Sequence, residues 1–157
     1  MSKNREYRNM TFEVRQDGAE PSFLVEGYAS TFEPYVLFSQ DGVDYSERID
    51  PHAFDEADMS DTVFRIDHTG TVYARTSAGT VSLWVDEHGL GQRTDLSKTQ
   101  KARELYEDIK AGNYPKMSFA FTETSDYSEE YGENFVSHHI RGFRRIWDVS
   151  GVDIPAY

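Results

Sequence analysis

One segment of this 157-residue chain has the apolar spacing of a long helix, whereas the other patterned segments have the spacing of β-strands. In the helical segment, apolar residues recur at i, i+3, i+4 and i+7, which places them on one face: Ala102, Leu105, Tyr106 and Ile109. Ser97 and Gln100 have the spacing of a capping box ahead of this face, and Gly112 follows it as a stop signal. The sequence therefore predicts one principal helix, about 98–111.

Segments rich in aromatic and β-branched residues predict strands on both sides of this helix. These segments are 11–14, 22–32, 62–68, 79–85, 90–96, 116–122, 135–141 and 143–154. The carboxylate-rich segment 33–48 is predicted as a long loop, and the acidic segment 124–134 as a mobile surface loop. Asp50-Pro51 is a helix-start signal and predicts a short helix near 51–57.

Composition excludes several classes of function. The formal charge of −12 gives no broad attraction to phosphate backbones or anionic membranes, so neither nucleic acid nor a membrane is expected as a partner. The chain has no cysteine, which excludes disulfides, thiol catalysis and cysteine-ligated metals. No stretch approaches the roughly 20 apolar residues that cross a bilayer, and the first ten residues lack a signal-peptide core.

These observations predict a soluble, intracellular protein with a single domain, 1–157. The predicted fold class is α+β, mainly antiparallel β, with a small barrel-like sheet and one principal helix. No metal or cofactor is expected. His138 and His139 point to opposite faces of a strand, so a solvated pair is expected there. The carboxylates between 41 and 47 lack the spacing of a calcium-binding loop.

Strand parity identifies Ser118 as a candidate nucleophile. In the strand 116–122, alternate side chains on one face are large and apolar: Met117, Phe119 and Phe121. The opposite face carries only small side chains: Ser118, Ala120 and Thr122. Such a face is either an ordinary polar outer surface or the floor of a groove that holds a reactive serine.

His68 is the candidate base. It shares a face with Phe64 and Ile66 and emerges at the strand end, just before a predicted turn at Thr69-Gly70. The neighbouring Asp67 points to the other face and is a poor partner for it. The alternative is a structural histidine with a satisfied hydrogen bond.

Asp148 is the candidate third member, because a carboxylate inside the apolar strand IWDVSGV needs a partner if it is buried. Parity places it with Ile146 and Ser150, opposite Trp147 and Val149. Its partner is either an imidazole or an arginine, and Arg144 lies four residues earlier on the same face. A serine nucleophile needs a base, and the base needs an orienting group, but parity alone does not bring the three together.

Motifs spread along the chain resemble the prohead serine proteases of tailed bacteriophages. In chain order they are 26–32 (EGYASTF), 50–54 (DPHAF), His68, Ala111-Gly112, 117–121 (MSFAF), 147–150 (WDVS) and Pro155-Ala156. The resemblance runs from about Val25 to the C-terminus. It implies a capsid-maturation protease, distantly similar to herpesvirus assemblins in fold and catalytic order.

Carried over by position, the family's histidine falls on His68, its serine on Ser118 and its acidic residue on Asp148. The family commonly has Glu at the acidic position, so Asp148 is one methylene shorter, and it often has Gly where Ala120 stands. The resemblance leaves the oxyanion hole to backbone N–H groups, with Arg144 or Arg145 as further candidates. The order His, Ser, acid differs from that of three other triads.

The resulting hypothesis is a serine endopeptidase that cleaves scaffolding segments of the phage major capsid protein, and also itself. It would act inside the immature capsid in the host cytoplasm, with homo-oligomers allowed. Family members usually continue into a tail, so the end at Tyr157 leads us to expect trimming or self-processing. The alternative is a non-enzymatic capsid-assembly or scaffolding module on the same fold.

Overall fold

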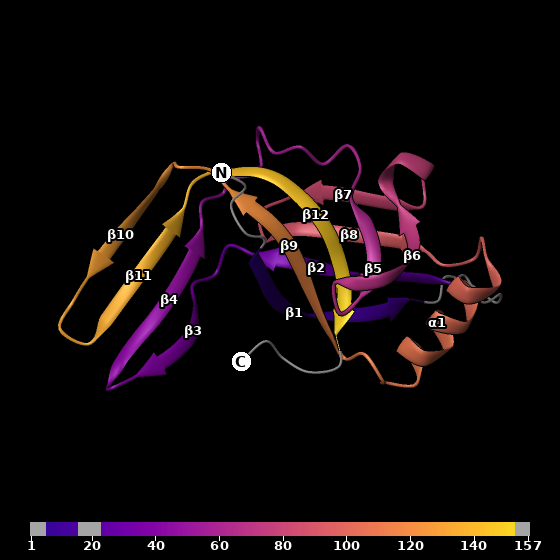
Figure 1. Ribbon diagram of the computed structural model, residues 1–157, viewed down its shortest axis with the longest axis horizontal. Coiled ribbons are helices and arrows are strands. Elements are labelled where there is room, and N and C mark those ends of the chain that lie inside the picture. Colours follow the sequence, from indigo (N-terminus) through magenta and orange to yellow (C-terminus); the bar gives the residue numbers. More distant parts are fainter. Residues whose placement is uncertain (1–5, 16–22, 153–157) are drawn as a thin grey trace.

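The computed structural model describes residues 6–15 and 23–152, which form two β-sheets and one α-helix (Figure 1). The larger sheet contains β1 (Glu6–Arg15), β2 (Leu24–Thr31), β5 (Val63–Ile66), β6 (Thr69–Arg75), β7 (Val81–Val85), β8 (Gly89–Asp95), β9 (Lys116–Glu123) and β12 (Phe143–Val152). The smaller sheet contains β3 (Tyr35–Gln40), β4 (Val43–Ile49), β10 (Tyr127–Tyr131) and β11 (Phe135–Ile140). The α-helix is α1 (Gln100–Lys110), and a 3₁₀ turn, η1 (Thr76–Ala78), follows β6.

Antiparallel pairs dominate both sheets, with parallel pairs at β12–β5 and β11–β4. The larger sheet runs in the order β6-β5-β12-β9-β1-β2-β8-β7, and the smaller in the order β10-β11-β4-β3. A mainly antiparallel α+β fold with one principal helix is thus confirmed. Among the described strands no pairing joins β6 to β7, so barrel-like closure stays a prediction.

A group of phenylalanines on β9 and β12 lies in the core, while α1 packs beside β6. The four predicted apolar residues of α1 are all buried, which confirms the helix. Phe119, Phe121 and Phe143 pack ring against ring at centroid distances of 4.8–5.9 Å. Because each fully buried side chain of this size contributes about 1.5–3 kcal/mol, these rings fix β9 against β12.

The helix begins later than predicted. Thr99 is its N-cap, and its Oγ1 accepts a hydrogen bond from the backbone N–H of Ala102 at 3.0 Å. The predicted capping box at Ser97 is therefore wrong; the Ser97 N–H instead donates to Asp95 Oδ1 at 2.8 Å. Gly112 has a φ of 90° and lies just beyond the helix end, as predicted.

Both predicted loops contain strands. Segment 33–48 forms the β3–β4 hairpin, which turns at Asp41 and Gly42 with φ values of 54° and 77°. Asp-Gly between apolar strands is a strong hairpin signal that the count of carboxylates obscured. Segment 124–134 contains β10, which pairs with β11 from Tyr127↔Ile140 to Tyr131↔Val136.

The predicted short helix near 51–57 is wrong: these residues form successive turns, in which Ala57 N–H donates to Phe54 O. In an α-helix Ala57 would donate to the carbonyl of Ala53, but that carbonyl accepts from Phe143 N–H at 3.0 Å. Asp58 then bridges to β12 through its N–H and C=O. The predicted strand 11–14 lies within β1, while residue 22 and residues 153–154 of the predicted strands lie outside the described residues.

Candidate active site

His68 lies in a two-residue turn that joins β5 to β6. Asp67 and His68 have φ values of 51° and 59°, and Ile66 pairs with Thr69 across the turn. The predicted turn at Thr69-Gly70 is thus wrong by two residues, because those residues already belong to β6. Left-handed backbone costs roughly 1 kcal/mol or more per non-glycine residue. Here β12 stabilises it, since Asp67 N–H donates to Gly151 O at 3.0 Å.

Ser118 lies on β9, which runs between β12 and β1 in the larger sheet. Its face is the one predicted: Met117, Phe119 and Phe121 belong to the core cluster, so Ser118 and Ala120 face the other way. Register pairs Ser118 with Ser150 and Ala120 with Asp148 of β12. Ser118 has no exposed surface.

Asp148 reaches this face through a β-bulge in β12. The pairing with β9 slips between Ile146 and Asp148, so that Ile146 and Val149 both belong to the core. The predicted grouping of Ile146 with Asp148, and of Trp147 with Val149, is therefore wrong. The extra residue places Trp147 and Asp148 on the same side, where both line one hollow.

The three candidate residues form one continuous hydrogen-bonded chain. His68 Nδ1 lies 2.6 Å from Asp148 Oδ1, and His68 Nε2 lies 2.8 Å from Ser118 Oγ. An ionised Asp148 fixes the tautomer: Nδ1–H donates to the carboxylate, which leaves Nε2 to accept from the Ser118 hydroxyl. The structure brings together all three predicted residues.

Ser150 belongs to the same constellation, and sequence reasoning gave it no role. Its Oγ donates to Asp148 Oδ1 at 3.0 Å and accepts from His68 N–H at 3.3 Å. It therefore ties the acid to the turn that carries the histidine. Parity offered a signal, because Ser150 lies two residues beyond Asp148 on the same face.

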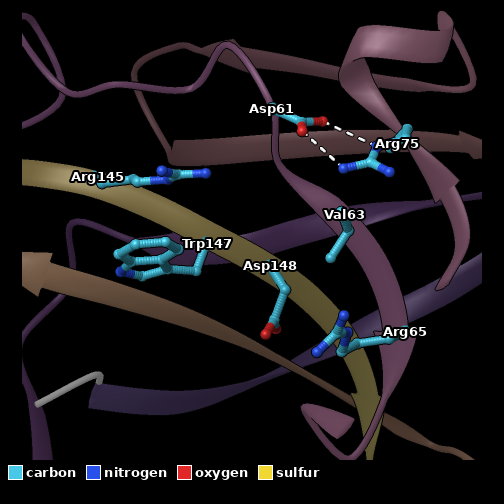
Figure 2. A pocket seen from close by; sticks show the side chains of 7 residues that line it. All are labelled: Asp61, Val63, Arg65, Arg75, Arg145, Trp147 and Asp148. Carbon is cyan, nitrogen blue, oxygen red and sulfur yellow. Dashed lines mark hydrogen bonds and ion pairs between the residues drawn. The ribbon is translucent and has the colours of Figure 1, made fainter. Parts of the chain in front are cut away.

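Asp148 borders a polar hollow of about 200 Å³ between β5, β6 and β12 (Figure 2). Arginines from all three strands line it: Arg65, Arg75 and Arg145. A bidentate ion pair with Arg75, at 2.6 and 3.0 Å, is the main reason that the pKa of Asp61 is lowered. The Asp148 side chain is 1% exposed, so the carboxylate is held by protein groups rather than by solvent.

The arginines that the sequence offered as partners lie elsewhere. Arg144 is exposed on β12, so the predicted alternative of an Arg144–Asp148 ion pair is not what the structure shows. Arg145 lies 3.9 Å above the Trp147 ring, whose Nε1–H donates to Thr122 Oγ1. Neither observation assigns an oxyanion hole, which stays a prediction.

The neighbouring histidines of β11 are not the solvated pair predicted. His138 Nε2 lies 2.7 Å from Glu123 Oε1, and its ring packs on Tyr127 at 4.8 Å. His139 lies against Arg48, and burial lowers its pKa below the usual value, with Arg48 and Arg141 adding to the effect. Over residues 6–15 and 23–152, no cluster of three or more metal-ligating side chains is found.

No helix in the described part of the chain is long and apolar enough to cross a membrane.

Hydroxyl, imidazole and carboxylate in one hydrogen-bonded line are the arrangement that defines serine hydrolases. The sequence matches the model of the caudovirus prohead serine protease family over residues 10–157, and the chain belongs to this family. It is therefore a serine protease of phage capsid maturation.

The fold gives a second, independent comparison. It is similar to the structure of the bacteriophage T4 capsid assembly protease gp21, with a TM-score of 0.53 and 11% sequence identity. The similarity covers 98% of this chain and 100% of that one. No curated protein sequence matches the chain.

Proposed function

We propose that Ser118 is the nucleophile of this protease, His68 its general base and Asp148 the group that orients His68. The observation that carries the proposal is the unbroken chain from Asp148 Oδ1 through both imidazole nitrogens to Ser118 Oγ. The shorter side chain of Asp148 is no obstacle, since the bulge in β12 brings its carboxylate within 2.6 Å of Nδ1.

In the proposed reaction, Ser118 Oγ attacks the scissile carbonyl carbon while its proton passes to His68 Nε2. Asp148 stabilises the imidazolium that forms. Collapse of the tetrahedral intermediate breaks the C–N bond, and Nε2 returns the proton to the leaving amine. Water then hydrolyses the acyl-enzyme by the same proton path, which restores the Ser118 hydroxyl. Backbone N–H groups are the proposed donors to the oxyanion.

The proposed substrates are scaffolding segments of the phage capsid protein, and the protease's own chain, within the immature capsid. The family supports this, and the T4 neighbour is itself a capsid assembly protease. The order His, Ser, acid along the chain supports the distant similarity to herpesvirus assemblins.

Ser118 is fully buried, so the surrounding chain has to open before a carbonyl carbon reaches its Oγ.

A fluorophosphonate probe tests the assignment directly, because it reacts only with an activated serine. The probe is expected to label Ser118, with labelling abolished in Ser118→Ala and reduced at least about 100-fold in His68→Ala. Ser82→Ala, which removes an exposed strand serine, is the matched control and should label normally. Labelling that survives Ser118→Ala contradicts the assignment, and a wild-type chain that neither labels nor cleaves a capsid segment favours the scaffolding module.

A further inference from the structure

Two buried polar atoms, one in the candidate triad and one beside it, lack partners. Asp148 Oδ2 and Arg65 Nε are both closed to solvent, and neither has a hydrogen-bond partner among the described residues. One is an acceptor and the other a donor, so each offers what the other lacks.

The two side chains lie on one face of neighbouring strands. Parallel pairing of β5 with β12 sets Arg65 beside Ser150 and Val63 beside Asp148. Phe64 belongs to the core, so Arg65 projects to the other face, which carries the candidate triad. Figure 2 shows the guanidinium of Arg65 directed toward the carboxylate of Asp148 in the hollow that both line.

The other arginines of this hollow are already engaged. Arg75 is bound by Asp61 through two hydrogen bonds, and Arg145 lies on the Trp147 ring. On the carboxylate itself, Oδ1 is used by His68 and by Ser150. Among the arginines of the hollow, Arg65 is therefore the one with a buried donor, Nε, that has no partner. Oδ2 is the oxygen of the Asp148 carboxylate that has no partner.

We propose that Arg65 is a positioning residue, whose guanidinium closes onto Asp148 Oδ2 and so keeps Oδ1 turned toward His68. The inference rests on the proposed function of the triad. It gives Asp148 a second anchor, from β5, in addition to Ser150 of its own strand. Because β5 also leads into the His68 turn, one strand then fixes both partners of the Oδ1–Nδ1 hydrogen bond.

The test compares Arg65→Gln with Arg65→Lys in the rate of fluorophosphonate labelling across pH. Arg65→Gln should slow labelling about 10-fold at neutral pH and move the acidic limb of its pH profile to higher pH, because a positive charge beside the imidazole is lost. Arg65→Lys, which keeps the charge, should recover the profile and part of the rate. The titratable or charged groups around Asp148 are His68 on the turn, Arg65 on β5, and Asp61, Arg75 and Arg145 at the hollow.

Arg75→Gln is the matched control, since it removes the same charge from the same hollow without touching Asp148. A double-mutant cycle separates positioning from general stability: in an Asp148→Asn background, Arg65→Gln should slow labelling no further. Equal slowing in both backgrounds, or an unchanged pH profile in Arg65→Gln, overturns the inference.

A second readout does not depend on activity. In Ser118→Ala, the low-field proton resonance of the His68 Nδ1–H group should weaken or shift when Arg65→Gln is added. An unchanged resonance contradicts the inference while leaving the proposed function intact. If the fluorophosphonate does not label the wild-type chain but the resonance changes with Arg65→Gln, the proposed function is contradicted instead.

Discussion

Two histidines of this protein are bound to buried carboxylates in nearly the same way, and only one belongs to the candidate active site. His68 lies 2.6 Å from Asp148, and His138 lies 2.7 Å from Glu123. The difference is in the second ring nitrogen. His68 Nε2 meets the hydroxyl of Ser118, whereas His138 Nδ1 lies 3.4 Å from a second carboxylate, that of Glu129.

The comparison shows that a histidine–carboxylate pair does not by itself make a catalytic base. Both ring nitrogens of His138 face carboxylates, at 2.7 and 3.4 Å, so this imidazole is directed at acidic groups and not at a serine hydroxyl. His68 has a carboxylate at one ring nitrogen and a hydroxyl at the other, which is the arrangement that a serine nucleophile needs from its base. His138 also connects β11 of the smaller sheet to β9 of the larger, so its expected role is structural.

The largest difference expected between the two histidine–carboxylate pairs appears when each carboxylate is neutralised. Asp148→Asn should lower the rate of fluorophosphonate labelling by about 10⁴-fold, because an amide favours the wrong imidazole tautomer. Glu123→Gln should leave labelling within about 3-fold of wild type, since the hydrogen bond between Glu123 and His138 lies outside the candidate triad. Equal losses in the two variants would break the distinction between the histidines.

Ser150→Ala is expected to have an intermediate effect. It removes the hydroxyl that bonds both Asp148 Oδ1 and the His68 backbone, at 3.0 and 3.3 Å. We expect labelling to slow about 10-fold, with the His68–Asp148 bond retained. Ser137→Ala, on β11 beside His138, is the matched control; a Ser150→Ala rate equal to it would show that the hydroxyl has no orienting role.

The pair of His138 and Glu123 is expected to affect stability and not activity. His138→Gln takes the imidazole from Glu123, which is buried, and should lower the free energy of unfolding by about 1–3 kcal/mol. Urea denaturation measures this, with His88→Gln, an exposed histidine, as the control. Labelling of the folded variant should stay at the wild-type rate, and a loss of labelling at unchanged stability would contradict a structural role for His138.

The smallest expected effect concerns His139. Its pKa is lowered below the usual 6.5 by burial and by two neighbouring arginines. The unfolded chain then binds a proton that the folded chain does not, so stability falls as pH drops through 6.5. His139→Gln should flatten the decrease in unfolding free energy between neutral pH and about pH 5. If denaturation curves of wild type and variant diverge equally at pH 8 and pH 5, the titration of His139 is not the cause.

Periodicity predicted the parts of the fold that depend on a single face. Helix α1 and the core face of β9 follow from spacing alone, since each buries one regular stripe. The bulge at Trp147 was beyond such reasoning, because the inserted residue reverses parity within the strand. The turns at 51–57 were also beyond it, since a distant N–H, that of Phe143, takes the carbonyl that a helix would use.

For the site, the residue types were predictable, and the resemblance to the prohead proteases placed them. That the three side chains meet in space was not predictable, because it depends on the strand order β5-β12-β9, which no local pattern contains. Arg65 illustrates this limit of sequence reasoning, because nothing in the sequence distinguishes it from other charged residues of the predicted strands. Its position beside Ser150 emerges only from parallel pairing with β12.

The turn that carries His68 has a consequence for how this protein tolerates changes in length. Asp41-Gly42 and Asp67-His68 are both two-residue turns with left-handed backbone. One added residue in the first would change a loop tip remote from Ser118, and length variation is expected there. One added residue in the second would rotate His68 away from both of its partners, so this turn should keep its length wherever the proposed chemistry is kept.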